Sequence, residues 1–174
     1  MGPNGAGKTT CFYIIAGLIK PDNGKVNIGK TDITGYPVFE RARIGLGYLP
    51  QEMSIFKGLS VEDNLLSIIE TKEFDNHKRY QILEDLLVEF NITKIRSSLG
   101  ITLSGGERRR VEIARCIASN PTHILLDEPF SGIDPIAIQD LKNLIGYLKQ
   151  RKIGVLITDH NVKDTLDIVD RAYV

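Results

Sequence analysis

A glycine-rich stretch at the start of the chain restricts its fold more than any other feature. Residues 2–9 read G-P-N-G-A-G-K-T and fit the pattern G-x-x-x-x-G-K-[ST]. Glycines let backbone N–H groups turn inward around phosphate oxygens, and the helix that follows offers its N-terminus. Lys8 would reach the β- and γ-phosphates, and the Thr9 hydroxyl would bind Mg²⁺. The alternative is a glycine-rich turn that only begins a helix.

The pattern therefore predicts a phosphate-binding loop. We expect its contacts to come from Gly2, Pro3, Asn4, Gly5, Ala6, Gly7, Lys8, Thr9 and Thr10.

A second motif pairs two acidic residues at the end of an apolar run. Residues 124–128 read I-L-L-D-E, as a buried parallel strand that ends in acid would. Asp127 can then hold the Mg²⁺ shell, and Glu128 can polarise an attacking water. A strand that simply runs into a solvated loop is the alternative, and the phosphate loop makes it the weaker one.

A third motif, L-S-G-G-E at residues 103–107, opens a helix. Ser104, Gly105 and Gly106 at a helix N-terminus form another phosphate cradle. Because residues 2–9 already provide one cradle, the second makes sense if it serves a nucleotide held by another subunit. A plainer interpretation is a capping box in which Ser104 is the N-cap and Glu107 is the third helical residue. Both interpretations can hold together.

Strands and helices alternate along the chain, and this pattern predicts an α/β fold with a mostly parallel core sheet. The segment 52–118 is almost wholly helical, which predicts a helical insertion. We expect strands at 25–33, 44–49, 122–127 and 154–158, and helices at 9–19, 60–71, 75–90, 105–119, 135–151 and from 161.

Composition excludes several classes of protein. There are 22 Lys+Arg and 22 Asp+Glu, and this balance argues against a nucleic-acid partner. The run Arg108–Arg110 is expected to be a solvated, ion-paired helix face. No apolar run reaches the 18 residues that a membrane span requires, and no secretion signal opens the sequence. Cys11 and Cys116 are expected to be buried thiols in a reducing compartment.

Taken together, G-P-N-G-A-G-K-T-T, L-S-G-G-E, I-L-L-D-E-P and T-D-H resemble the nucleotide-binding subunits of ABC transporters along essentially the whole chain. The resemblance implies a P-loop ATPase fold, ATP and Mg²⁺ as cofactors, and catalysis by Glu128 and His160. It implies that Gln51 is a magnesium ligand together with Thr9 and Asp127. It also implies that Asp134 lies in a loop at the dimer interface. It also places Ser104, Gly105, Gly106 and Glu107 against the partner's ATP.

The implied partners are a second copy of the chain and two transmembrane permease subunits that dock near Gln51 and Phe56. Phe56 and Leu59 have two interpretations that are about equally favoured. They form an apolar socket for a partner helix, or they close the core of the chain itself. The subunit would contact the membrane only through these partners, in the cytoplasm at the inner membrane.

Within the family, Y-L-P-Q-E-M-S-I-F and T-D-H-N-V look like the ATPase subunits of lipopolysaccharide export. The nearest rival is the ATPase of a branched-chain amino acid importer. A soluble ABC ATPase without a membrane partner and an inactive fragment are alternatives of other classes.

The family carries a strand before the phosphate loop and further elements after the last helix. We therefore expect residues 1–174 to be one ABC ATPase domain that is incomplete at both ends. The chain as it stands is expected to hydrolyse ATP weakly or not at all, because the loop lacks its anchoring strand.

Overall fold

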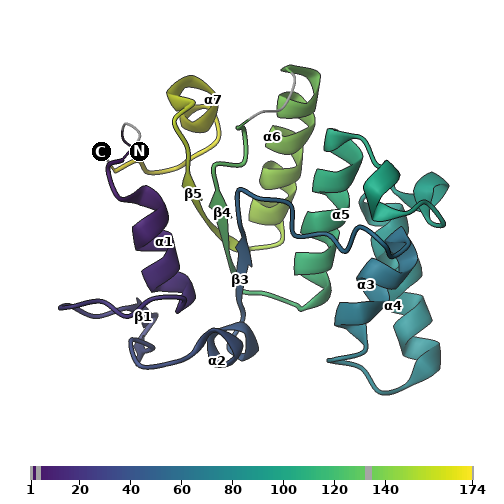
Figure 1. Ribbon diagram of the computed structural model, residues 1–174, viewed down its shortest axis with the longest axis horizontal. Helices are drawn as coiled ribbons and strands as arrows, with labels where there is room; N and C mark the ends of the chain where they lie inside the picture. Colours follow the sequence, from purple (N-terminus) through teal and green to yellow (C-terminus); the bar gives the residue numbers. More distant parts are fainter. Residues whose placement is uncertain (1, 3–4, 132–134, 174) are drawn as a thin grey trace. The chain divides into compact units, whose positions relative to one another are not determined.

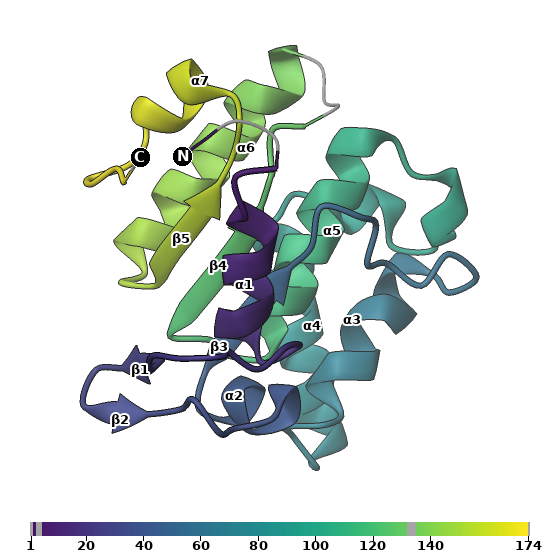
Figure 2. The same cartoon turned by 60° about the vertical axis from the view of Figure 1, so that its left-hand side comes forward.

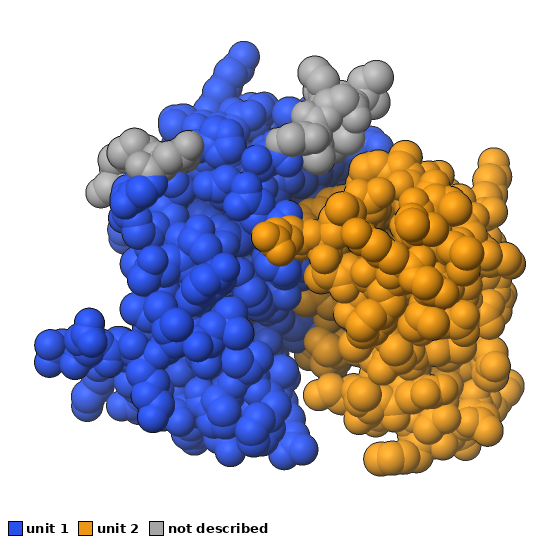
Figure 3. All heavy atoms as spheres, in the orientation of Figure 1, with its two compact units in different colours: residues 1–51, 121–174 blue, residues 52–120 orange. Residues whose placement is uncertain are grey.

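The computed structural model describes residue 2 and residues 5–131 and 135–173, without the side chains of residues 135–137. These residues divide into two compact units. Unit 1 contains residues 1–51 and 121–174, and unit 2 contains residues 52–120 (Figure 3). Each unit has its own core, so each is described separately.

A three-stranded parallel sheet is the centre of unit 1 (Figure 1). Its order is β3 (Leu46–Leu49), β4 (His123–Asp127), β5 (Gly154–Thr158). In the register, Leu49 lies opposite Leu126 and Asp127 lies opposite Thr158. All three strands run the same way, so their carboxyl ends meet at one edge, and the predicted parallel core sheet is confirmed.

Two helices cover opposite faces of this sheet (Figure 2). On one face, α1 (Lys8–Ala16) packs Phe12 and Ala16 against Leu46 and Leu125. On the other side lies α6 (Pro135–Gln150), whose residues Leu141, Ile145 and Leu148 are buried. Side chains alternate across a strand, which is why β4 can contribute apolar residues to both faces.

The remaining elements of unit 1 are short. An antiparallel hairpin joins β1 (Asn27–Ile28) to β2 (Thr31–Asp32), and Gly29 takes a positive φ of 58° between them. α7 (Val162–Leu166) follows β5. The sequence patterns missed α2 (Val38–Arg43), which is only six residues long.

Unit 2 is built on three helices. They are α3 (Val61–Ile69), α4 (Asn76–Glu89) and α5 (Gly105–Ala118), joined by the 3₁₀ turns η1 (Thr93–Ile95) and η2 (Gly100–Thr102). Ser60 and Asp75 accept backbone N–H groups as the N-caps of α3 and α4. The buried residues of this unit include Leu65, Ile69, Leu83, Leu87, Val111 and Ile113.

Three sequence-based expectations are corrected. The apolar run G-V-L-I-T at 154–158 predicts a buried strand, but Leu156 of β5 is 42% exposed; among the described residues β5 pairs only with β4. Cys11 is exposed, because it falls outside the apolar face of α1. Arg109 is largely covered rather than solvated, and it is ion-paired with buried Glu112 at 3.2 Å.

No helix in the described part of the chain combines the length and the apolar character needed to cross a bilayer.

Candidate functional site

The backbone of the phosphate-loop segment takes the conformation that its glycines permit. Gly5 and Gly7 have φ angles of 81° and 82°, which side-chain-bearing residues rarely adopt. A Cβ at either position would meet nothing within 4 Å, so the requirement for glycine here is conformational rather than steric. Gly7 is the N-cap of α1 and uses no side-chain cap.

Lys8 is the first residue of α1, and its ammonium group turns back over the segment. Its Nζ donates a hydrogen bond of 2.9 Å to the carbonyl oxygen of Gly2. The side chain therefore lies where a group bound at the N-terminus of α1 would meet a positive charge and the helix dipole. Pro3 and Asn4, which we expected among the contacts, lie outside the described residues.

Each of the three parallel strands leads to a predicted site residue at its carboxyl end. Gln51 follows β3, Glu128 follows Asp127 at the end of β4, and His160 follows β5. In open α/β sheets this edge is where ligands bind. The fold thus brings together residues that lie 77 and 32 positions apart in the sequence.

Glu128 is the point on which these side chains converge. Gln51 Nε2 donates to Glu128 Oε2 at 3.1 Å, and His160 Nδ1 lies 3.5 Å from the same oxygen. Lys8 Nζ lies 3.9 Å from Glu128 Oε1. The Glu128 side chain is 13% exposed, so the carboxylate is held among two nitrogen-bearing groups and one ammonium group with restricted access to water.

The backbone of Glu128 is unusual as well. Its φ is +44°, in the left-handed region that disfavours residues with a Cβ. Its N–H donates to Thr158 O at 2.8 Å, and its carbonyl accepts from Ser131 N–H at 3.1 Å. This bend turns the carboxylate away from the strand direction, and such strain is typical of functional positions.

Asp127 is buried beneath this cluster. Thr158 Oγ1 donates to Asp127 Oδ1 at 2.5 Å, and the Tyr48 hydroxyl lies 3.5 Å from Asp127 Oδ2. Burial, followed by the negative charge of Asp127, raises the pKa of Tyr48 well above its ordinary value. Tyr48 therefore remains a neutral hydroxyl that can donate to the carboxylate.

The predicted magnesium ligands form a donor set of hard oxygens. Thr9 offers a hydroxyl, Gln51 an amide oxygen and Asp127 a carboxylate, which suits Mg²⁺ bound together with phosphate oxygens. Among the described residues no group of three or more His, Cys, Asp or Glu is placed to hold a metal by itself. The donor chemistry fits a metal that is shared with a phosphorylated ligand.

In unit 2, the capping box expected at the start of α5 is present. Ser104 N donates to Glu107 Oε2 at 2.9 Å, and Ser104 Oγ donates to the same oxygen at 2.6 Å. These bonds lower the pKa of Glu107. Ser104 and Gly105 are exposed, so the N-terminus of α5 stays accessible. The second cradle remains a prediction.

Phe56 and Leu59 are 49% and 38% exposed. The Phe56 ring lies beneath the Arg115 guanidinium at 4.6 Å, and Phe56 N donates to the buried amide of Asn64. Both side chains are thus only partly covered, and a socket for a partner at Phe56 and Leu59 stays a prediction. Asp134, the expected dimer-interface residue, lies outside the described residues.

Sequence patterns missed three neighbours of the site: Tyr48, Thr158 and Asp159. Asp159 is fully buried, and its place after an apolar strand is the same signal that singled out Asp127. Thr158 and Tyr48 carry no comparable signal, since each is an ordinary strand residue.

Known proteins match the chain along its length. A family model described as ABC transporter matches residues 1–131. The chain is 56% identical over 174 residues to an uncharacterized ABC transporter ATP-binding protein of Rhizobium meliloti, of which it covers 64%. It is 54% identical over 175 residues to the lipopolysaccharide export system ATP-binding protein LptB of Haemophilus influenzae, of which it covers 73%. Both alignments include the whole of this chain.

Two solved structures share the fold. MJ1267, an ATP-binding cassette of an ABC transporter, matches 98% of this chain with a TM-score of 0.84 and 29% identity, over 72% of its own length. The cassette MJ0796, solved as a dimer in a post-hydrolysis state with ADP and phosphate, matches 94% of this chain with a TM-score of 0.80 and 26% identity, over 74% of its length. The chain thus spans 64% of the Rhizobium meliloti relative and 72–74% of the other three proteins.

Proposed function

The chain belongs to the ABC transporter family, and from that premise we propose that it is the ATP-hydrolysing part of a transporter subunit. The observation that carries the proposal is the convergence of Lys8, Gln51 and His160 on Glu128, beside the glycine-rich turn. A general base needs neighbours that orient it, and Lys8, Gln51 and His160 are such neighbours of Glu128.

In the proposed reaction, residues 2–10 hold the phosphates of ATP through backbone N–H groups. Lys8 offsets the charge on the β- and γ-phosphates, Glu128 orients and polarises the attacking water, and His160 contacts the γ-phosphate. Thr9, Gln51 and Asp127 would hold Mg²⁺, which when bound neutralises phosphate charge.

The proposed active form is a head-to-tail homodimer. The exposed N-terminus of α5, with Ser104, Gly105, Gly106 and Glu107, would meet the ATP of the partner copy. Its free N–H groups and positive dipole end support an interaction with phosphate. Asp134 is proposed to lie at the same interface. The cassette MJ0796, solved as a dimer, supports a dimeric form by analogy.

Hydrolysis is tested by steady-state phosphate release from the full-length protein. Glu128→Gln removes the base with little change in shape, and we expect a fall of at least about 100-fold in kcat. Asp85→Asn, the same change on the exposed face of α4, is the matched control and should hydrolyse at the wild-type rate. Wild-type turnover in Glu128→Gln would overturn the assignment.

The dimer is tested on the same variant by light scattering. Glu128→Gln is expected to bind ATP without consuming it, so we expect a stable dimer with Mg²⁺ and ATP and a monomer without nucleotide. A monomer under both conditions would remove the shared site and the role given to Ser104.

The finer proposal is that the transporter exports lipopolysaccharide. Identity of 54% to LptB of Haemophilus influenzae and 51% to LptB of Escherichia coli supports it, as does the P-Q-E-M-S-I-F segment. The subunit would then work at the cytoplasmic face of the inner membrane and contact it only through two permease subunits. Export ATPases of this type and branched-chain amino acid importer ATPases differ in the permeases that they bind.

Copurification from the native membrane separates these alternatives, with mass spectrometry to identify the permeases. We expect lipopolysaccharide-export permeases, and amino acid permeases would refute the cargo. Phe56→Ala should weaken the association, because half of the Phe56 ring is open to a partner. Phe74→Ala is the matched control, since Phe74 is 85% exposed and lies outside the proposed docking segment.

A further inference from the structure

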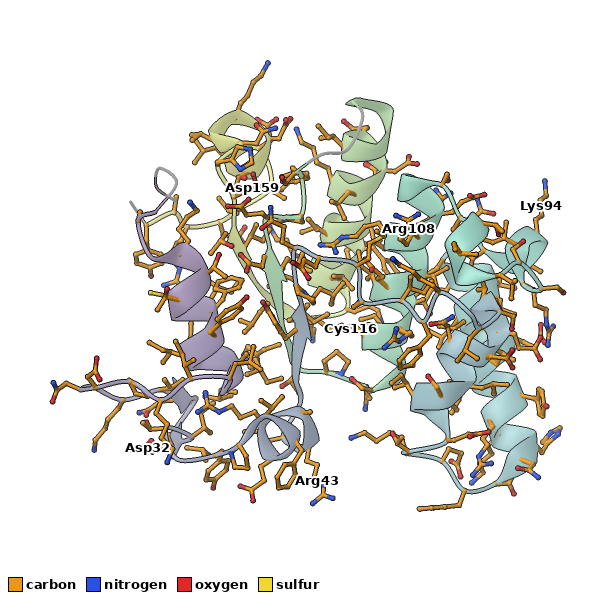
Figure 4. The ribbon with its side chains drawn as sticks, in the orientation of Figure 1. Asp32, Arg43, Lys94, Arg108, Cys116 and Asp159 are labelled. Carbon is orange, nitrogen blue, oxygen red and sulfur yellow. The ribbon has the colours of Figure 1, made fainter. Side chains whose placement is uncertain are left out.

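Asp159 is a buried carboxylate that none of the proposed catalytic steps uses. Its side chain is fully buried where β5 leads into α7 (Figure 4). A charge in such a place is costly unless it is compensated by hydrogen bonds. The hydrogen-bond partners of the Asp159 carboxylate therefore indicate its role.

The two oxygens of Asp159 bind the backbones of two different loops. Oδ2 accepts from Phe130 N–H at 2.9 Å, two residues after Glu128. Oδ1 accepts from Asn161 N–H at 2.8 Å, one residue after His160. Each catalytic residue thus lies just before a backbone amide that the same carboxylate holds.

A carboxylate is well suited to this double role. It accepts through both oxygens, whereas the isosteric amide of asparagine offers one oxygen and would present an NH₂ group to the second N–H. Hydrogen bonds from N–H groups to a charged acceptor are also stronger than neutral ones.

His160 needs such a support because its own side chain is poorly enclosed. The ring is half-exposed, at 50%, and its Nδ1 lies 3.5 Å from Glu128 Oε2 and 3.8 Å from Asp159 Oδ1. Packing does not fix a ring in that position, so the backbone on either side must. On one side, the pairing of β5 with β4 holds Thr158 opposite Asp127. On the other side, Asn161 is held by Asp159 and by its contacts with Asp164 at the start of α7.

We propose that Asp159 is a positioning residue that ties the backbone after Glu128 to the backbone after His160, so that the two side chains keep a fixed separation. The proposal rests on the proposed function for its effect on turnover. Its structural part, the placement of the His160 ring, can be measured without any turnover.

The test uses Asp159→Asn and Asp159→Ser in the complete protein. Both variants remove at least one of the two hydrogen bonds, and serine does so with a smaller side chain in case asparagine prevents folding. Residues 1–174 contain three histidines, His77, His123 and His160, and NMR of histidine-labelled protein follows their rings. His160→Ala assigns the His160 signals.

We expect the His160 ring signals to shift and broaden in both variants, while those of His77 and His123 stay in place. We also expect kcat for ATP hydrolysis to fall about tenfold with the KM for ATP nearly unchanged, because misplacing a reacting group by a fraction of an ångström has effects of this order. Asp85→Asn should change neither.

The outcomes separate this inference from the function on which it rests. If wild type hydrolyses ATP and Glu128→Gln does not, but the Asp159 variants keep the wild-type His160 signals and kcat, the inference is wrong. A fall in thermal stability without any change at His160 would also refute it, since Asp159 would then serve only folding. If wild type hydrolyses nothing while the His160 ring still moves, the proposed function fails and the positioning role stands.

Discussion

Gln51 Nε2 and Glu128 Oε2 are joined by a hydrogen bond of 3.1 Å, although they follow different strands of the sheet. The pairing depends on the parallel order of β3 and β4, which brings the carboxyl ends of both strands to one edge. Gln51 therefore donates to the residue that we propose as the base, and this direct contact can be tested separately from magnesium binding.

Replacing Gln51 should slow hydrolysis, and two different replacements should slow it to different extents if Gln51 contacts Glu128 directly. Hydrogen bonds to charged groups contribute about 1.5–3 kcal/mol, so Gln51→Ala should lower kcat about 10- to 100-fold. Gln51→Glu should be slower still, because it places a second carboxylate against Glu128. Phosphate-release assays over a range of Mg²⁺ concentrations measure both variants. Equal rates in the two variants at saturating Mg²⁺ would contradict the direct role.

The positive φ of Glu128 predicts a reversal of the usual order of glycine and alanine. In an exposed helix, glycine is less stable than alanine by about 1 kcal/mol. At a φ of +44°, Cβ is disfavoured instead, so Glu128→Gly should be more stable than Glu128→Ala by about 1 kcal/mol.

Denaturant unfolding of the two variants measures this difference. The same pair at Asp85, in the interior of α4, is the control and should show the ordinary order. If alanine is the more stable residue at both positions, the backbone strain at Glu128 is not real.

The regular elements were largely predictable from the sequence because local patterns determine them. Ser104 and Glu107 have the spacing of a capping box, and the structure forms one. The unbroken apolar run before Asp127 predicted a buried strand, and residues 124–127 are buried. The helix expected at 9–19 is present as α1 and ends at Ala16, with Gly17 at a φ of 85° as its C-cap.

The contacts around the site could not be predicted in the same way, because they join distant residues. Nothing near Asp127 in the sequence indicates that Thr158 and Tyr48 would reach its carboxylate. Asp159 was missed although it follows an apolar strand, because the hydrogen bond to Phe130 spans 29 residues. The burial of Arg41 was missed for the same reason, since its partners lie up to 27 residues away.

The capping box of α5 predicts a dependence of stability on pH. Hydrogen bonds from Ser104 lower the pKa of Glu107 in the folded chain. The ionised carboxylate therefore stabilises the fold above the pKa of the unfolded chain, and this contribution is lost as the pH falls through the lower folded value.

Glu107→Gln should thus reduce the free energy of unfolding by about 0.5–1 kcal/mol near neutral pH, a modest value because the pair is partly exposed. The difference from wild type should narrow in acid, as the pH falls from the ordinary glutamate pKa of about 4.3 through the lower folded value. Urea unfolding at several pH values measures it, with Asp85→Asn as a variant that should match wild type throughout. A difference that is the same at every pH would argue against a role for the charge.

Arg41 anchors the end of α1 opposite Lys8. Its guanidinium donates to the carbonyl oxygens of Ile14 and Ile15 at 2.6 and 2.7 Å, and to those of Thr34 and Tyr36 at 3.0 and 2.8 Å. The side chain is only 2% exposed, and burial lowers its pKa. α1 has no basic residue in its own last turn, so Arg41 supplies the cation that favours the C-terminal end of a helix.

Arg41→Ala should therefore lower the free energy of unfolding by about 3 kcal/mol or more, because four partly buried carbonyl groups lose the guanidinium that binds them. Arg41→Lys should fall between alanine and wild type, since one ammonium group cannot span four carbonyls that the planar guanidinium reaches. Arg43→Ala is the control: Arg43 is exposed and lies over the Phe39 ring at 5.4 Å, an interaction worth about 0.5–1 kcal/mol at such a site. Denaturant midpoints of the three variants give the order, and an equal loss in Arg41→Ala and Arg43→Ala would show that the four carbonyl contacts do not hold α1 in place.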